Sequence, residues 1–138
     1  MSDEAFIDSG AFIAFLDRSD RSHEDAVALF ASPPRRWCTS AFVVSETYSW
    51  FLHRLGEEAA RTFRLLLAEL PRLTILDGSR PHRDAVARKL DALRGRKLTY
   101  VDASSLVWLA ERDIEVVWGT DHHLGLEGAR IVPGAPAR

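Results

Sequence analysis

Short apolar runs alternate with longer segments in which apolar residues recur every three or four positions. The short runs predict strands at residues 5–7, 36–39, 73–76, 115–118 and 130–132. The longer segments predict helices at residues 11–16, 22–30, 41–55, 57–70, 81–93 and 100–112. Strands separated by helices favour a parallel sheet that is covered on both faces. We therefore expect an α/β fold, a three-layer sandwich with a mostly parallel, five-stranded sheet flanked by helices.

Capping and turn residues mark the ends of several predicted helices. Ser22 with Asp25 resembles a capping box for the second helix, and Thr99 with Asp102 resembles one for the last helix. The inward face of the 41–55 helix is predicted to consist of Val44, Tyr48, Phe51 and Leu55. Because no repeat or linker interrupts the pattern, we expect one domain at residues 1–132. A Pro/Gly/Ala tail at residues 133–138 is expected to fray.

Composition narrows the class of protein. Of the 138 residues, 46% are apolar and 28% are charged, which excludes a disordered or fibrous chain. The 18 Lys and Arg residues against 20 Asp and Glu give a net charge of -2, so nucleic acid would need a local basic patch. The single cysteine, Cys38, excludes a disulfide within the chain and is predicted to be a buried structural thiol. The acidic N-terminus and the absence of a membrane-spanning apolar stretch favour a cytoplasmic protein.

Two carboxylates follow predicted strands. Asp8 comes directly after residues 5–7, and Asp121 lies three residues after residues 115–118. In parallel sheets, ligands bind beyond the carboxyl ends of the strands, where the strand order reverses. Carboxylates that converge there repel each other unless a hard divalent cation such as Mg²⁺ or Mn²⁺ neutralises them. The structural alternative is a capping role, for Asp8 at the helix near residue 11 and for Asp121 at a turn over residues 122–123.

Two further acidic residues are ambiguous from local pattern alone. Asp102 completes the capping box with Thr99, and it also begins the inward stripe that continues through Leu106 and Leu109. Both roles are compatible with one carboxylate. Glu46 lies off the predicted inward face of its helix, where an ordinary solvated glutamate is the default and periodicity cannot decide.

Five segments carry these acidic residues in a recognisable order. They are residues 6–12, 20–26, 45–46, 98–103 and 117–124, and they space Asp8, Glu46, Asp102 and Asp121 by 38, 56 and 19 residues. Together they resemble the PIN-domain family of metal-dependent ribonucleases, which includes the VapC-type toxins of toxin–antitoxin pairs. The resemblance covers nearly the whole chain. It departs from the family pattern at Gly119, where Thr or Ser is usual, and at Leu124, where Phe is usual.

The resemblance implies a PIN-like fold and hydrolysis of RNA phosphodiester bonds with Mg²⁺ or Mn²⁺ as cofactor. It implies that Asp8, Asp102 and Asp121 are metal ligands and that Glu46 orients a metal-bound water or acts as the general base, so that all four residues are catalytic. It also implies a toxin role, with a cognate antitoxin whose basic tail enters the acidic groove. Dimerisation through the helices is expected on the same ground.

A basic run lies just before the third acidic motif. Residues 80–97 contain seven of the 18 basic residues, and Arg94, Arg96 and Lys97 lead into Thr99. We expect these three side chains to contact RNA phosphates, the alternative being an ordinary solvated face. Trp50 lies one helical turn beyond Glu46, with core packing as its default role and stacking on a base as the functional alternative.

The histidines suggest no zinc site. The adjacent residues His122 and His123 are expected to point in different directions, and the Cys or His partners of a structural zinc site are missing. His53 and His82 are predicted to lie on the surface.

Other functions remain to be weighed against a toxin ribonuclease. A non-catalytic binding module on the same fold could use the acidic cleft to hold a basic segment of a partner, and the Gly119 departure keeps this possibility open. An RNA-processing nuclease that is not a toxin would share the same residues. A nucleotide-binding or phosphoacceptor domain is disfavoured because the chain has no P-loop and no GxGxxG motif.

Overall fold

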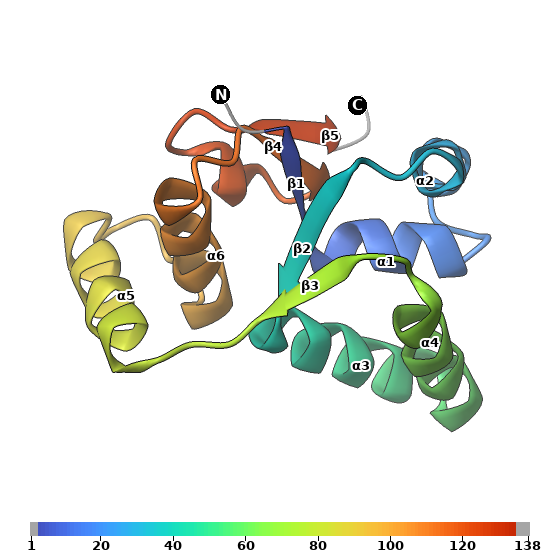
Figure 1. Cartoon of the computed structure of the whole chain (residues 1–138). Coiled ribbons are helices and arrows are strands. Elements are labelled where there is room, and N and C mark those ends of the chain that lie inside the picture. The colour runs from blue at the N-terminus through green and yellow to red at the C-terminus, as the bar shows by residue number, and fades with distance from the viewer. Residues whose placement is uncertain (1–2, 135–138) are drawn as a thin grey trace.

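The structure, a computed structural model, describes residues 3–134 and contains a five-stranded sheet within them (Figure 1). Its strands are β1 (Glu4–Ile7), β2 (Arg36–Ser40), β3 (Leu73–Leu76), β4 (Val116–Gly119) and β5 (Arg130–Pro133). They lie in the order β3-β2-β1-β4-β5, and each neighbouring pair is parallel. The predicted α/β sandwich with a five-stranded sheet is confirmed.

Helices cover both faces of this sheet. One face carries α1 (Ser9–Leu16), α2 (His23–Ala31), α3 (Ala41–Leu55) and α4 (Glu57–Glu69), and the other carries α5 (Arg80–Ala92) and α6 (Tyr100–Glu111). The connections from β1 to β2 and from β2 to β3 step in one direction across the sheet, whereas the connection from β3 to β4 returns past β1. Because parallel crossovers are right-handed, this reversal places α5 and α6 opposite the first four helices.

The strand order reverses between β1 and β4, which are neighbours in the sheet. Ile7 pairs with Trp118, and the backbone amide of Asp8 donates to the Trp118 carbonyl over 2.9 Å. The hydroxyl of Thr39, at the end of β2, donates to the Ile7 carbonyl over 2.7 Å. The residues that follow β1 and β4 therefore lie next to each other at one hydrogen-bonded edge of the sheet. Ligands usually bind at this edge in parallel sheets.

The main core lies between the sheet and the first four helices. Phe12 of α1 packs edge-on against Phe63 of α4, and Trp37 of β2 meets Trp118 of β4 in the same cluster, with ring centroids 5.6 Å apart. Burial of such aromatic side chains is a dominant stabilising contribution. A smaller cluster around Val86 joins α5 to α6. Both clusters hold helices whose N-terminal ends lie at the carboxyl edge of the sheet.

The inward face of α3 differs from the prediction. Instead of Val44, Tyr48, Phe51 and Leu55, the helix buries Val43, Thr47 and Phe51, and Leu55 is 51% exposed. Thr47 can be buried because its hydroxyl donates to the Val43 carbonyl over 2.7 Å. A hydrophobic pattern does not identify a polar residue such as Thr47 as part of the core. The prediction therefore named Val44 and Tyr48 where the helix buries Val43 and Thr47.

Two further predictions about single residues are wrong. Ser22 precedes α2, but its side chain makes no capping hydrogen bond, and its backbone amide donates instead to the Asp20 carboxylate over 2.8 Å. His82 is 3% exposed: its ring stacks on Trp108 with centroids 4.1 Å apart and shares a 2.7 Å hydrogen bond with the hydroxyl of Ser104. Contacts between α5 and α6, invisible in local sequence, decide its burial.

Other expectations concern the thiol, the tail and membranes. Cys38 is fully buried, as predicted, and burial raises the pKa of its thiol to about 12. Two residues of the expected tail are part of the fold, because Pro133 belongs to β5 and the Gly134 amide donates to the Gly119 carbonyl. Residues 135–138 lie outside the described residues. Among residues 3–134, no helix is long and apolar enough to cross a membrane.

Candidate functional site

The structure brings all four predicted carboxylates to the carboxyl edge of the sheet. Asp8 follows β1, Asp121 follows β4, Asp102 lies in the first turn of α6 and Glu46 lies in the second turn of α3. The charges of Glu46, Asp121 and Asp102 each raise the pKa of Asp8. Four acidic groups from four elements therefore share one electrostatic environment, although their catalytic and metal-binding roles stay predictions.

Asp8 is the most buried member of this group. Its side chain makes no capping hydrogen bond to α1, so the structural alternative of a helix cap does not account for the carboxylate. Asp8 is 5% exposed, and burial together with the neighbouring carboxylates raises its pKa from 3.8 to about 7, against the opposing effect of the Ser9 amide. A carboxylate kept at this depth, with no cationic partner among residues 3–134, is suited to a bound cation.

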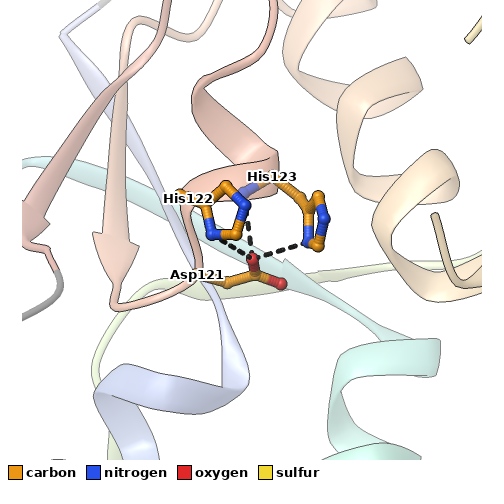
Figure 2. Close-up of side chains that lie close together, drawn as sticks. All are labelled: Asp121, His122 and His123. Carbon is orange, nitrogen blue, oxygen red and sulfur yellow. Dashed lines mark hydrogen bonds and ion pairs between the residues drawn. The ribbon is translucent and has the colours of Figure 1, made fainter. Parts of the chain in front are cut away.

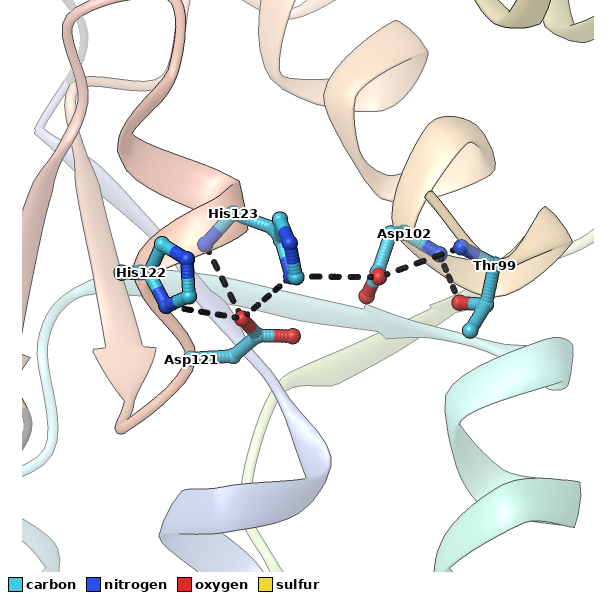
Figure 3. Close-up of polar contacts among 5 residues, drawn as sticks. All are labelled: Thr99, Asp102, Asp121, His122 and His123. Carbon is cyan, nitrogen blue, oxygen red and sulfur yellow. Dashed lines mark hydrogen bonds and ion pairs between the residues drawn. The ribbon is translucent and has the colours of Figure 1, made fainter. Parts of the chain in front are cut away.

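Asp102 combines a structural and a site role. Its backbone amide donates to the Thr99 hydroxyl over 3.1 Å, and its Oδ2 accepts from the Thr99 amide over 3.3 Å, which confirms the predicted capping box (Figure 3). Burial, followed by the charge of Asp121, raises the pKa of Asp102, while the hydrogen bonds from Thr99 lower it. The capping box thus fixes the orientation of a carboxylate that still faces Asp121.

Glu46 is exposed on α3, but its carboxylate is turned toward the site. The hydroxyl of Ser9, in the first turn of α1, donates to this carboxylate and lowers its pKa. Partial burial, with the charges of Asp102 and Asp121, raises the same pKa by a larger amount. Glu46 is thus an exposed glutamate, as the local pattern favours, whose carboxylate also interacts with the other acidic groups of the site.

Asp121 is held by the turn that follows it. Its Oδ1 accepts from the His123 backbone amide over 2.9 Å and lies 2.9 Å from His123 Nδ1 and 4.0 Å from His122 Nδ1 (Figure 2). His123 Nδ1 also lies 3.7 Å from Asp102 Oδ2, so this imidazole stands between two of the acidic groups (Figure 3). Asp121 therefore caps the turn, as its structural alternative predicts, and faces the site at the same time.

The expectation that the two histidines point apart is wrong. Their ring centroids are 4.3 Å apart, and both rings turn back toward the carboxylate at the start of the turn. Asp121, His122 and His123 offer three ligand atoms within 4.8 Å of one another. Imidazole nitrogen suits Zn²⁺ or Ni²⁺, whereas the oxygen-rich group formed by Asp8, Asp102 and Asp121 suits Mg²⁺ or Mn²⁺.

A pocket of about 440 Å³ opens beside the carboxylates. Its lining residues are Asp8, Ser9, Gly10, Ile13, Glu46, Ser49, Trp50, His53, Arg54, Thr120 and Asp121. This volume is within the usual range for small-ligand sites. A cavity of about 550 Å³ lies near the C-terminal end of α6 and the start of β4, but none of the four carboxylates lines it. We therefore place the candidate site at the smaller pocket.

The departure at Gly119 has a steric explanation. A Cβ atom at this position would lie 3.1 Å from the Cβ of Asp8, so a side chain here would press on the buried carboxylate. At Gly10, a Cβ atom would collide with Thr120 Oγ1 and lie 3.0 Å from the Thr120 backbone nitrogen. The first turn of α1 therefore accommodates Thr120, which lines the pocket beside Asp121. Thr120 supplies the hydroxyl on this side of the pocket.

The basic run does not gather at the pocket. Arg94, Arg96 and Lys97 are exposed in the segment before α6, and their contact with RNA stays a prediction. Lys89, from the same run, pairs with Glu127 over 2.8 Å. Arg54 lines the pocket instead, with its guanidinium 5.5 Å from the centroid of the Trp50 ring. The sequence pointed to this residue only through its spacing of eight from Glu46 along one helix face.

Comparison with known proteins agrees with this arrangement. The family model described as "PIN domain" matches residues 5–125. The chain belongs to the PIN domain family. The resemblance seen in its acidic motifs is thereby confirmed, and the matched span includes all four carboxylates of the site. No curated protein matches the chain in a sequence search.

Several solved structures share the fold. The chain has 22% sequence identity to the crystal structure of Mycobacterium tuberculosis VapC20, a toxin that cleaves the sarcin-ricin loop, with a TM-score of 0.84 over 91% of this chain and 96% of that one. It has 18% identity to DNA-bound VapBC from Salmonella typhimurium, with a TM-score of 0.65 over 93% and 96%. It has 20% identity to a toxin–antitoxin complex from Klebsiella pneumoniae, with a TM-score of 0.60 over 92% and 94%. At these identities the likeness establishes the fold.

Proposed function

We propose that this protein is a metal-dependent endoribonuclease that acts as the toxin of a toxin–antitoxin pair. The convergence of Asp8, Glu46, Asp102 and Asp121 at the strand-order reversal of a PIN domain carries the proposal. A purely structural cluster of this kind would cost stability, because like charges at short range raise one another's pKa. The structurally similar toxin VapC20 cleaves the sarcin-ricin loop, which agrees with this proposal.

The donor set fits a hard divalent cation. Asp8, Asp102 and Asp121 would hold Mg²⁺ or Mn²⁺ through carboxylate oxygens, directly or through water. When bound, the ion would neutralise charge on the phosphate and lower the pKa of water at the site. The raised pKa values of Asp8 and Asp102 support this assignment, since a cation would offset both the burial and the repulsion that raise them.

Glu46 has the position of a proton acceptor. Ser9 holds its carboxylate by a hydrogen bond, and partial burial keeps the pKa of this carboxylate above the ordinary value. A general base works best when its pKa approaches the working pH and its position is fixed. Glu46 would orient the attacking water and accept its proton, and no nucleophilic serine or cysteine is needed.

Binding of RNA requires positive charge near the site. Arg94, Arg96 and Lys97 are exposed just before α6, the helix that carries Asp102, and would contact phosphates that extend away from the cut. Replacing the three by glutamine should weaken RNA binding most at low salt. If the triple variant and wild type show the same slope of affinity against salt concentration, the three residues do not contact the RNA.

Cleavage of RNA by the purified protein is the direct test. Wild type, Asp8→Asn, Asp102→Asn and the exposed control Asp84→Asn should be incubated with total RNA and with a structured RNA, with Mg²⁺, Mn²⁺ or EDTA. We expect metal-dependent cleavage by wild type and Asp84→Asn, and none by the two site variants, which should remain folded by circular dichroism. If folded wild type binds metal in calorimetry but cuts no RNA, the chain is a non-catalytic binding module instead.

The toxin role predicts a partner. We propose a small antitoxin with a basic segment that enters the acidic pocket and displaces the metal, in keeping with the toxin–antitoxin complexes that share this fold. A short gene directly upstream should encode it, and its co-expression should relieve growth arrest caused by the wild-type chain. Cleavage without growth arrest would identify a processing nuclease that is not a toxin. Sedimentation at several concentrations tests the expected homodimer.

A further inference from the structure

One face of α3 carries side chains suited to nucleic acid on both sides of the acidic site. Phe42, Glu46, Trp50 and Arg54 recur every four residues, so they share this face, and each step advances about 6 Å along the helix axis. The buried face of the helix is a neighbouring one, formed by Val43, Thr47 and Phe51. The stripe of Phe42, Glu46, Trp50 and Arg54 lies beside this buried face and is partly accessible to a ligand that runs along α3.

The C-terminal half of this stripe forms an aromatic and cationic platform, made by Trp50 and Arg54. Trp50 is half-buried and packs edge-on against Phe51, with ring centroids 5.3 Å apart and planes at 90°. The Arg54 guanidinium lies over the indole, 5.5 Å from its centroid. Both groups line the same pocket as Asp8 and Glu46, and Arg54 is the lining residue with a permanent positive charge. Indole rings and guanidinium planes are the groups on which unpaired bases stack.

The N-terminal half ends in a second aromatic pair. Phe42, in the first turn of α3, meets Tyr100, the first residue of α6, in a T-shaped contact with ring centroids 5.6 Å apart. Phe42 is 37% exposed and Tyr100 is 44% exposed. Each aromatic residue lies within about one helical turn of a carboxylate of the site, Glu46 on α3 and Asp102 on α6.

We propose that single-stranded RNA lies along this face of α3. The scissile phosphate would sit at the carboxylates, one flanking base on the Trp50–Arg54 platform and a base on the other side of the cut at the Phe42–Tyr100 pair. This proposal rests on the proposed ribonuclease function and adds its substrate-positioning residues. Arg54 would attract a phosphate at the platform, and a divalent cation held by Asp8 and Asp121 of the same pocket would offset the repulsion between RNA and the acidic residues.

Stacking of this kind is tolerant of base identity. Every base has a face that can stack, so the platforms would select unpaired over paired RNA and set the position of the cut, rather than read a particular sequence. In a duplex the faces of the bases are already covered by their neighbours. A single-stranded segment or loop is thus the class of substrate that the α3 face fits.

Binding can be measured apart from cleavage in the Asp8→Asn background. A short single-stranded RNA with 2-aminopurine next to the cut reports stacking through its fluorescence, and the same RNA in a duplex is the comparison. Trp50→Leu and Tyr100→Ala should each weaken binding by about 5- to 100-fold, the usual loss for one stacked base, and abolish the change in fluorescence at one position. Arg54→Gln should weaken binding and reduce its dependence on salt.

Matched controls come from α4. Arg64→Gln and Leu65→Ala alter exposed residues of the same kinds and should change the dissociation constant by less than about twofold. Because Trp50 is half-buried, thermal melting must show that Trp50→Leu is folded at the assay temperature. The exposed Tyr100→Ala variant tests the same proposal without that concern.

The outcomes separate this proposal from the proposed function. If wild type cleaves RNA but the Trp50, Arg54 and Tyr100 variants bind single-stranded RNA as tightly as their background, the platforms are wrong and the ribonuclease function stands. If wild type cuts no RNA with either metal, the function fails and the platforms fail with it. If a basic peptide, but not RNA, binds and loses affinity in Trp50→Leu, the surface belongs to a protein partner and the RNA proposal is overturned.

Discussion

Replacing Asp8 with asparagine should stabilise the metal-free protein while it abolishes RNA cleavage. Asp8 is 5% exposed and shares its surroundings with Glu46, Asp102 and Asp121. Asparagine has nearly the same shape but carries no charge, so the substitution removes the repulsion and the burial of an ionised group. If the Asp8 carboxylate stabilised the fold, the substitution would instead lower the free energy of unfolding.

The magnitude follows from the pKa of Asp8, which burial and the neighbouring carboxylates raise from 3.8 to about 7. At 1.36 kcal/mol per pKa unit, this difference corresponds to about 4 kcal/mol once Asp8 is ionised in both the folded and the unfolded chain. The unfolded chain releases the proton near pH 3.8 and the folded protein only near pH 7. The contribution of Asp8 to the free energy of unfolding is therefore lost as the pH rises through this window, and it is constant above it.

Urea unfolding of metal-free wild type, Asp8→Asn and Asp84→Asn between pH 4 and 8 measures the effect. The advantage of Asp8→Asn over wild type should be small at pH 4 and about 4 kcal/mol at pH 8, equivalent to roughly 10 °C in Tm. The exposed control Asp84→Asn should stay within about 0.5 kcal/mol of wild type throughout. Added Mn²⁺ should raise the Tm of wild type more than that of Asp8→Asn, because the cation relieves the same repulsion.

Two results would refute this reasoning. Equal or lower stability of metal-free Asp8→Asn at pH 8 would mean that the fold already compensates the charge of Asp8. A stability gain that does not vary between pH 4 and 8 would assign the effect to packing rather than to ionisation.

Three other perturbations test separate parts of the structure. Burial lowers the pKa of His82, so the stability that the neutral imidazole contributes should be lost as the pH falls below the ordinary value of 6.5. Urea unfolding at pH 7.5 and 5.5 measures this loss, which should be smaller in His82→Gln than in wild type. The added methyl group of Gly10→Ala should press on Thr120, lower the free energy of unfolding by about 1–3 kcal/mol and lower RNA cleavage at least tenfold. The double variant Gly10→Ala/Thr120→Ala should regain part of the lost stability. Arg112→Ala should lower the free energy of unfolding by about 1.5–3 kcal/mol, because it removes two charge-assisted hydrogen bonds to the buried Glu4 carboxylate; an unchanged free energy in urea unfolding would contradict this.

Positions of the helices and strands could largely be predicted from the sequence, because the signals that set them are local. The strand at Leu73–Leu76 and the helix at Ala41–Leu55 have the predicted bounds, since short apolar runs and a helix-ending glycine act over a few residues. The capping box of Thr99 and Asp102 was likewise visible in four residues of sequence. The order of the acidic motifs was enough to suggest the family, which the domain match confirms.

Local pattern failed where a contact with a distant element decides the outcome. His82 looks like a surface residue on a basic helix, yet Trp108 and Ser104 of α6 enclose it. The burial of His82 depends on neighbours that the chain brings back after more than twenty positions.

The candidate site shows the same division. The sequence by itself determined which acidic residues are present, their order and their places at element ends, because strand ends and helix starts are local features. Only the tertiary structure decided that β1 lies beside β4, that Asp8 is buried among three other carboxylates, and that His123 stands between Asp102 and Asp121. Charge repulsion, burial and stacking depend on distance through space, and the strand order of the sheet sets those distances.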